Sequence, residues 1–339
     1  MKLQSAGTTY SQAQVVRWLD ENSFIVGRWD GSISIFRKPI PSVEFGPIMK
    51  ATLLTPSQAG IEMMTVFNPR MFITSNGRDE FVFWWKKYGK YLKKTIPYNP
   101  EFGTANSGLF IPGEKLFISG HEMGFLTIWR VNGKTFHLIK SVDLRSPNPI
   151  PSPFPVKNIR SVKYWKNNIV ITGSDDGDIC MVKVPTGEVL FRMRYNSTAQ
   201  RGINDLALVD NYLLLANCSV GSADKNLWLY TISENQITLL DSYNLIEDPG
   251  KPQVFNFSID LTPVDNRLVF VAGTEEGLLW LGEVIDNQLT VSSKTKIDCI
   301  CTEDGLSLGP GGAALDVYQD PWTLAAVSWT IRLYTLAIE

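Results

Sequence analysis

A ten-residue pattern recurs seven times along the chain, and it limits the possible folds more than any other feature. Its first copy is Gly27–Phe36, with the sequence GRWDGSISIF. Successive copies start 45 to 53 residues apart, a period typical of proteins that stack one supersecondary unit repeatedly. The copies begin at Gly27, Ser75, Gly120, Gly173, Gly221, Gly273 and Ala325.

The seventh and ninth positions of the pattern are apolar in every copy. The seventh is held by Ile33, Phe81, Leu126, Ile179, Leu227, Leu279 and Ile331, and the ninth by Ile35, Phe83, Ile128, Met181, Leu229, Leu281 and Leu333. Apolar residues at a spacing of two indicate a strand with one buried face. Another short apolar run precedes each copy, and glycine after a short acid lies between the two runs, as in residues 29–31, 175–177 and 275–277. Each copy is therefore predicted to be a tight hairpin.

Most hairpins are flanked by two further strand-like runs. The runs before the hairpins are 14–19, 63–67, 161–165, 203–209, 255–261 and 313–318. The runs after them are 90–96, 134–142, 188–194, 236–243 and 289–296. Four antiparallel strands per unit make a propeller blade, so the sequence predicts an all-β, seven-bladed β-propeller.

The repeat resembles the WD40 family through its Gly-x-x-Asp-Gly-x-x-x-x-apolar pattern, with Trp84 and Trp129 at the signature aromatic place. The chain departs from that family in two ways. The Gly-His pair usually found ahead of the first strand is missing, and the Trp29-Asp30 pair lies in a hairpin turn instead of ending a third strand. We therefore expect the aromatic-rich core, more than the family's side-chain tetrads, to supply the rigidity.

The ring needs an outer strand for its last blade, because the final copy ends at Tyr334, five residues before the last residue. In WD40 proteins a segment ahead of the first blade supplies that strand. The resemblance therefore implies that residues 2–9 form the outer strand of the last blade, which closes the ring. We expect residues 1–339 to form this one domain.

Composition agrees with a globular protein, since 44% of the residues are hydrophobic and 19% are charged. The net charge of -2 provides no overall field toward nucleic acid or membrane. No apolar run approaches the roughly 18 residues of a membrane span, and the first residues lack a signal-peptide core. We expect an intracellular protein, in the cytoplasm or the nucleus.

The hairpin turns and the connections between blades should form one face, called the top face here, which is the commonest partner surface of WD40 proteins. We predict that it binds a protein partner within a larger assembly. Trp29 and Trp329 fall on adjoining blades. Either they form a partner-binding patch together with Arg28, or each indole ring only covers a neighbouring loop. Pro147–Pro155 is a docking arm or a passive strap. The candidate partner-binding residues are Arg28, Trp29, Arg78, His121, Glu122, Phe154 and Trp329.

One dense basic patch lies after the second copy, where tyrosines alternate with lysines. Such a patch can hold phosphates and stack bases, so a nucleic-acid-binding propeller is the alternative function. A solvated edge whose lysines discourage sheet aggregation is the simpler interpretation. The lysines are Lys86, Lys87, Lys90, Lys93 and Lys94.

Catalysis has little support in the sequence. His121 and His137 are the only histidines, and neither has a plausible nucleophilic partner nearby. No phosphate-binding, zinc-protease or Cys-x-x-Cys motif is present, and the four cysteines are interpreted as free thiols. We expect a non-catalytic scaffold with no cofactor and no metal. A ring of carboxylates converging on the central channel would instead favour a hydrolase.

Overall fold

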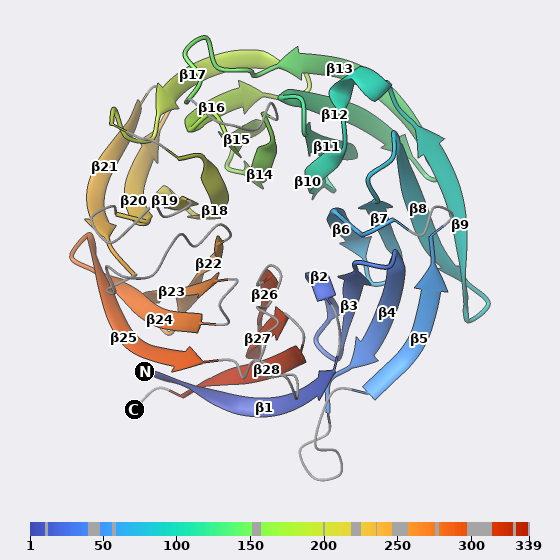
Figure 1. Ribbon diagram of the computed structural model, residues 1–339, viewed down its shortest axis with the longest axis horizontal. Helices are drawn as coiled ribbons and strands as arrows, with labels where there is room; N and C mark the ends of the chain where they lie inside the picture. Colours follow the sequence, from blue (N-terminus) through green and yellow to red (C-terminus); the bar gives the residue numbers. More distant parts are fainter. Residues whose placement is uncertain are drawn as a thin grey trace, which may run out of the picture.

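Seven antiparallel sheets of four strands surround a central axis in the computed structural model (Figure 1). The structure describes residues 1–10, 13–39, 48–55, 59–150, 157–198, 201–217, 225–234, 236–245, 257–274, 278–296, 314–327 and 330–337. This arrangement confirms the predicted all-β, seven-bladed propeller.

Each blade runs from an innermost to an outermost strand in chain order, except the last. Blade 1 contains β2 (Ala13–Asp20), β3 (Ser23–Arg28), β4 (Ser32–Arg37) and β5 (Ile48–Leu54). Blade 2 contains β6 (Met63–Asn68), β7 (Met71–Ser75), β8 (Glu80–Lys87) and β9 (Lys90–Pro97). Blade 3 contains β10 (Ala105–Ile111), β11 (Leu116–His121), β12 (Phe125–Asn132) and β13 (Thr135–Asp143), preceded by a short 3-10 helix (Pro100–Phe102). Blade 4 contains β14 (Ile159–Tyr164), β15 (Ile169–Ser174), β16 (Asp178–Lys183) and β17 (Glu188–Arg194). Blade 5 contains β18 (Ile203–Val209), β19 (Tyr212–Asn217), β20 (Leu227–Ser233) and β21 (Gln236–Tyr243). Blade 6 contains β22 (Phe257–Val264), β23 (Arg267–Thr274), β24 (Leu278–Ile285) and β25 (Gln288–Lys296). Blade 7 contains β26 (Ala314–Gln319), β27 (Trp322–Val327), β28 (Thr330–Ala337) and β1 (Lys2–Tyr10).

The ring is closed by the N-terminal strand, as predicted. Strand β1 pairs antiparallel with β28, from Lys2 opposite Ala337 to Tyr10 opposite Thr330. The start of β1 and the end of β28 consequently lie side by side in blade 7 (Figure 1). Closure leaves no interrupted edge in the ring, because strands far apart in sequence share one sheet.

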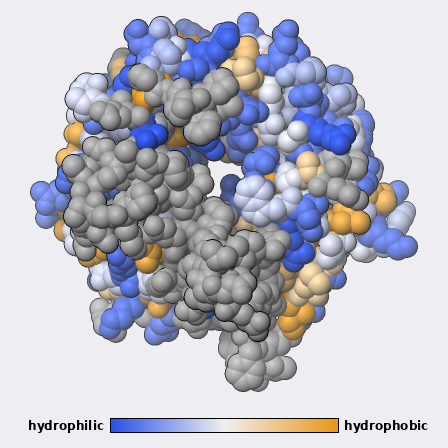
Figure 2. Space-filling model, in the orientation of Figure 1, coloured by the Kyte–Doolittle hydropathy of each residue, from blue (hydrophilic) through white to orange (hydrophobic). Residues whose placement is uncertain are grey.

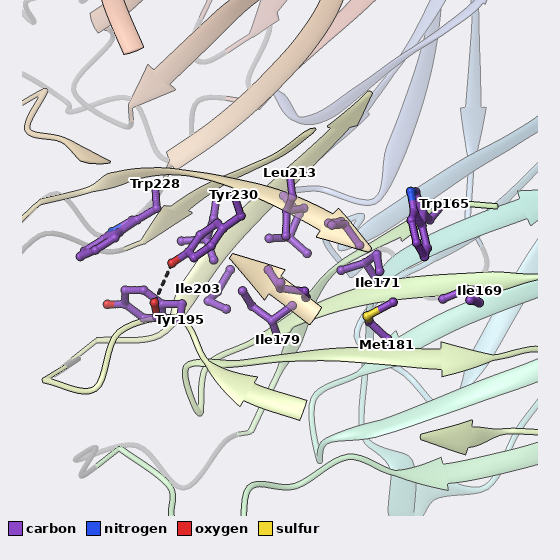
Figure 3. Close-up of a cluster of buried hydrophobic side chains, with 14 residues drawn as sticks. Trp165, Ile169, Ile171, Ile179, Met181, Tyr195, Ile203, Leu213, Trp228 and Tyr230 are labelled. Carbon is purple, nitrogen blue, oxygen red and sulfur yellow. Dashed lines mark hydrogen bonds between the residues drawn. The ribbon is translucent and has the colours of Figure 1, made fainter. Parts of the chain in front are cut away.

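The core lies between the blades. Each pair of adjoining blades buries its own apolar cluster. The fourteen apolar positions of the repeat are all at most 7% exposed. Figure 3 shows the cluster between blades 4 and 5, where the buried Tyr230 hydroxyl donates to the Tyr195 carbonyl at 2.6 Å. The apolar residues that alternate along the strands thus supply the contacts that hold neighbouring blades together.

The first residue of the repeat is small because the next blade packs directly against it. A Cβ atom added at Gly27 would lie 2.7 Å from Ile61, and one added at Gly173 would lie 2.7 Å from Ile203. Real Cβ atoms essentially never come that close to other atoms. The recurring glycine is therefore a requirement of packing between blades.

Candidate partner-binding surfaces

Of the seven predicted partner-binding residues, five lie in the described part of the chain. Arg28, Trp29, Arg78, His121 and Glu122 fall at or beside the turns between the second and third strands of blades 1 to 3. Phe154 and Trp329 lie outside the described residues, so the predicted patch of Trp29 with Trp329 stays a prediction. The turns share the top face with the connections between blades.

Trp29 projects from a turn whose backbone is well fixed. The Gly31 amide donates to the Arg28 carbonyl at 3.2 Å, and the Ile61 amide of blade 2 donates to the same oxygen at 3.0 Å. The Asp30 carboxylate accepts from the Ser32 amide at 2.8 Å. The Trp29 side chain is nevertheless 52% exposed. A rigid turn therefore presents a large aromatic surface to solvent.

Arg78 and Glu122 occupy the corresponding turns of the next two blades. Arg78 is exposed, while its carbonyl accepts a hydrogen bond from the Tyr98 hydroxyl at 2.9 Å. Glu122 is half-buried, and its carboxylate lies 3.4 Å from the Thr104 amide. Arg78 is thus available to a partner, whereas Glu122 also supports the connection into blade 3.

His121 was predicted to lie on the partner-binding surface, but the structure buries it completely. Its Nδ1 faces the Gly103 carbonyl at 3.1 Å, so Nδ1 carries the proton. Nε2 lies 3.0 Å from both the Ser119 and the Thr127 hydroxyl oxygens. Burial lowers the pKa of His121 to about 4, so the ring is neutral at pH 7. This histidine is a structural residue and cannot contact a partner.

The His121 ring belongs to a buried polar network that stiffens blade 3. The Trp129 indole donates to the Thr127 hydroxyl at 2.8 Å, and Thr127 lies 2.6 Å from the Ser119 hydroxyl. Networks of only two residues occur in two other blades. Trp84 donates to Thr74 at 3.2 Å in blade 2, and Trp228 donates to Asn217 at 2.7 Å in blade 5. Side-chain networks therefore contribute rigidity beyond the aromatic core that the sequence emphasised.

The proline-rich connection is held down at its start. Ile150 is buried and lies where a side chain at Gly177 would have to go, and the Ser146 amide donates to the Asp176 carboxylate at 2.9 Å. Lys157 completes this arrangement, 3.1 Å from Asp176. The connection is thus anchored at Ile150, and residues 151–156, including Phe154, lie outside the described part, so the docking arm and the passive strap both stay predictions.

The five predicted basic-patch lysines are exposed on the hairpin and outer strand of blade 2. Two bind neighbouring backbone, since Lys93 donates to the Leu54 carbonyl at 2.8 Å and Lys94 to the Lys134 carbonyl at 3.3 Å. Lys86, Lys87 and Lys93 lie 5.0 to 5.7 Å from the centres of aromatic rings. Part of the patch therefore braces the rim across blades 1 to 3, and nucleic-acid binding stays a prediction.

The central channel contains charged side chains from six innermost strands or the residues just before them. A cavity of about 200 Å³ lies there, and the axis is open at its centre (Figure 2). Its charged lining residues are Arg17, Glu62, Arg160, Lys163, Asp205, Asp260 and Asp316. Carboxylates do converge on the channel, which was the feature expected to favour a hydrolase.

Most of these carboxylates join blades. Asp205 accepts from the Ser161 hydroxyl of blade 4 at 2.9 Å and from the Ile259 amide of blade 6 at 3.1 Å. Asp316 accepts from the Trp18 amide across the closure of the ring at 2.7 Å. Glu62 accepts from the Gln14 amide group of blade 1 at 3.0 Å. These bonds account for the three carboxylates without any catalytic role.

Asp260 is the least engaged carboxylate of the channel. The Thr262 hydroxyl of its own strand donates to it at 2.7 Å. Protein surrounds the carboxylate, although channel solvent still reaches part of the residue. Burial raises the pKa of Asp260 to about 7, with the Asp316 and Asp205 charges acting in the same direction and Lys163 opposing them. The described residues that line the cavity include no histidine, and the hydroxyls of Ser161 and Ser258 both donate to Asp205.

Three further properties bear on function. Within the described ranges, no helix is long and apolar enough to cross a membrane. In the same part of the chain, no group of three or more His, Cys, Asp or Glu residues is arranged to hold a metal ion. Cys180 is buried, which raises the pKa of its thiol to about 11, and the other three cysteines lie outside the described residues.

Comparison with known structures identifies the architecture. The Cps50 (Swd1) β-propeller domain of Myceliophteria thermophila superposes with a TM-score of 0.68, over 97% of this chain and 100% of that domain. The fold is that of a WD40-type propeller. At 12% sequence identity, the likeness extends to the fold alone. No protein-family model and no curated protein sequence matches the chain.

Proposed function

We propose that this propeller is a non-catalytic scaffold that binds a protein partner on its top face, as a subunit of a larger assembly. The observation that carries the proposal is the half-exposed Trp29 indole on a fixed turn. Tryptophan and arginine are enriched among the residues that dominate interface energies. Because the turn is already ordered by hydrogen bonds, binding through Trp29 costs little additional entropy.

The neighbouring turns extend this surface across two blades. Arg28 adjoins Trp29, and the exposed Arg78 occupies the equivalent turn of blade 2. An aromatic side chain flanked by guanidinium groups is suited to an apolar partner residue surrounded by carboxylates. The expected partner is therefore a protein segment with an acidic margin.

A non-catalytic role agrees with the use of the polar residues. His121 is buried in a structural network, and the channel carboxylates Glu62, Asp205 and Asp316 join neighbouring blades. The intracellular location and the single domain over residues 1–339 belong to the same proposal.

The test is affinity capture with mass spectrometry on three forms of the full chain. The top-face variant carries Trp29→Ala and Arg78→Ala. The control variant carries Val189→Ala and Leu190→Ala, which remove two exposed side chains from the outer strand of blade 4. We expect partners captured by the wild type to be retained by the control and lost by the top-face variant. Equal capture by all three forms would contradict the proposal.

A further inference from the structure

The face opposite the partner-binding surface is formed by two sets of turns. One set joins the first and second strands of each blade, and the other joins the third and fourth strands. The two sets meet within blades, as the Lys86 amide donates to the Arg70 carbonyl and the Val131 amide to the Lys115 carbonyl, both at 2.8 Å. These turns make one continuous surface, which we call the bottom face.

The bottom face is divided by charge. At its described turns, blades 2 and 3 carry six exposed cations and one exposed carboxylate, Glu114. The cations are Arg70, Lys86, Lys87, Lys90, Lys115 and Lys134. The described turns of blades 5 and 6 carry four exposed carboxylates, Asp210, Glu234, Asp265 and Asp286. Arg267 of blade 6 pairs with Glu283 at 3.6 Å. One side of the face is thus basic, and the other is acidic.

Among the described residues of this face, Tyr88 is the most exposed large hydrophobic side chain. It lies at the β8–β9 turn with φ 51° and is 91% exposed. The following Gly89 also has a positive φ, 78°. Such turns favour glycine, asparagine and aspartate, because other side chains are strained in that conformation. The equivalent turn of blade 6 uses Asp286 and Asn287, in keeping with this preference.

In the part of the chain that the structure describes, no packing contact offsets the strain at Tyr88, which is 91% exposed. Its ring lies 5.0 Å from the Lys87 ammonium group, which is itself exposed. An exposed aromatic flanked by Lys86, Lys87 and Lys90 has the character of an anchor for binding. The feature that it fits should be a hollow with an apolar wall and carboxylates at its edge.

Blade 6 carries such a hollow on the same face. A groove of about 530 Å³ lies between its turns and the start of β19. Ile285, which is 49% exposed, provides apolar surface, and Asp286 and Glu283 provide carboxylates. Tyr212 donates to Asn287 at 2.9 Å and helps to fix the groove's edge. Its volume is within the range of small-molecule pockets and is ample for an aromatic side chain.

The order of the blades makes the two features self-complementary. When two copies meet through their bottom faces, a two-fold axis through blade 4 sets blade 2 of each copy against blade 6 of the other. The same axis sets blade 3 against blade 5. Both pairings place a basic sector on an acidic one, and one axis produces both contacts.

We propose that the chain forms a bottom-to-bottom homodimer, in which Tyr88 of each copy enters the blade 6 groove of its partner. The flanking lysines then meet the carboxylates at the edge of that groove. The top faces remain outward, so the dimer presents two copies of the partner-binding surface. This inference rests on the bottom face alone and does not depend on the function proposed for the top face.

The test measures the mass of the full chain in solution by sedimentation equilibrium, at about 0.05 M and about 1 M salt. A basic-sector variant carries Lys86→Glu, Lys87→Glu and Lys90→Glu, and an acidic-sector variant carries Asp265→Lys and Asp286→Lys. We expect a wild-type dimer that weakens at high salt. Each variant alone should be monomeric, and an equimolar mixture should form a heterodimer. Tyr88→Ala should weaken the dimer at least about tenfold, which is the usual scale of a hot-spot residue.

Circular dichroism and urea unfolding check that every variant is folded, and Trp29→Ala should remain dimeric. A wild type that is monomeric at both salt concentrations overturns the proposal, as does a mixture of variants that stays monomeric. Salt-sensitive binding of heparin by a monomeric wild type would likewise overturn it, and would assign the basic sector to an external polyanion. A top-face variant that loses its partner but still dimerises separates the two proposals.

Discussion

Lowering the pH should destabilise the protein through His121, and the comparison variant is His121→Asn. The imidazole is fully buried and faces the Gly103 carbonyl, two hydroxyl groups and the rings of Tyr98 and Phe102. Among the described residues, no carboxylate contacts the ring to stabilise an imidazolium. The folded protein therefore resists protonation of a group that protonates freely in the unfolded chain.

The sign and size of the effect follow from the two pKa values. The pKa of His121 falls from 6.5 to about 4 on folding, so the unfolded state binds more protons between these values. Stability from this residue is present above pH 6.5 and is lost as the pH falls through that interval. The fall of the His121 pKa from 6.5 to about 4 corresponds to about 3 kcal/mol of unfolding free energy in full, of which about 2 kcal/mol is lost between pH 7 and pH 5.

The assay is urea unfolding of the wild type and His121→Asn at a series of pH values. Asparagine retains a donor and an acceptor but does not titrate, so the difference between the two proteins isolates the histidine. We expect the variant to be less stable by about 1–3 kcal/mol at pH 7. The gap should narrow by about 2 kcal/mol at pH 5. A gap that is the same at both pH values would refute the assignment of a neutral, structural His121.

Four further substitutions or deletions test the fold and the channel. Gly173→Ala should cost about 1–3 kcal/mol of unfolding free energy in urea titrations, because its Cβ would lie 2.7 Å from Ile203; an unchanged midpoint would contradict the packing argument. Tyr230→Phe should cost about 0.5–1.5 kcal/mol by removing the hydrogen bond that the Tyr230 hydroxyl donates to the Tyr195 carbonyl, with the solvent-exposed Tyr88→Phe as the control. Asp260→Asn should be more stable than the wild type at pH 8, by a free energy of unfolding on the order of 2 kcal/mol, because channel solvent reduces the effect of burial. This gain should disappear as the pH falls through 7 toward 4, where the wild-type carboxyl group is protonated. A gain independent of pH would disprove the raised pKa of Asp260. Deleting residues 1–9 should lower the thermal midpoint by removing most of β1 from β28, whereas an unaltered midpoint would show that closure contributes no stability.

The repeat predicted the blades because burial is periodic in a strand that packs on two neighbours. Residues such as Ile33 and Phe81 are buried for that reason. The alternation of apolar and variable positions reveals such strands even in a single sequence. Strands β5 (Ile48–Leu54) and β10 (Ala105–Ile111) were not predicted. Strand β5 is the exposed outer strand of its blade and β10 contains Asn, Ser and Gly, so neither shows the apolar alternation that marks a strand.

The candidate sites were less predictable, because they depend on which residues the ring brings together. His121 reads as an exposed turn residue in sequence, yet it ends β11 beneath Tyr98 and Phe102. The channel charges Arg17 and Asp316 are 299 residues apart, and only closure makes them neighbours, with 3.9 Å between charged atoms. The apolar neighbours of Asp260 make it look like a buried strand position in sequence, and no local signal indicates that it faces a channel.

The channel carboxylates stiffen this propeller in a second way, in addition to the buried polar networks within blades. A tetrad acts within one blade, whereas Asp205 accepts hydrogen bonds from blades 4 and 6 while belonging to blade 5. Asp316 similarly connects blade 7 to Trp18 of blade 1. Each of these carboxylates lies at the narrow centre of the ring, where neighbouring blades are closest. Bonds at that position resist the relative tilting of blades, so the turns on both faces keep fixed positions. Such fixed turns are what a binding platform requires.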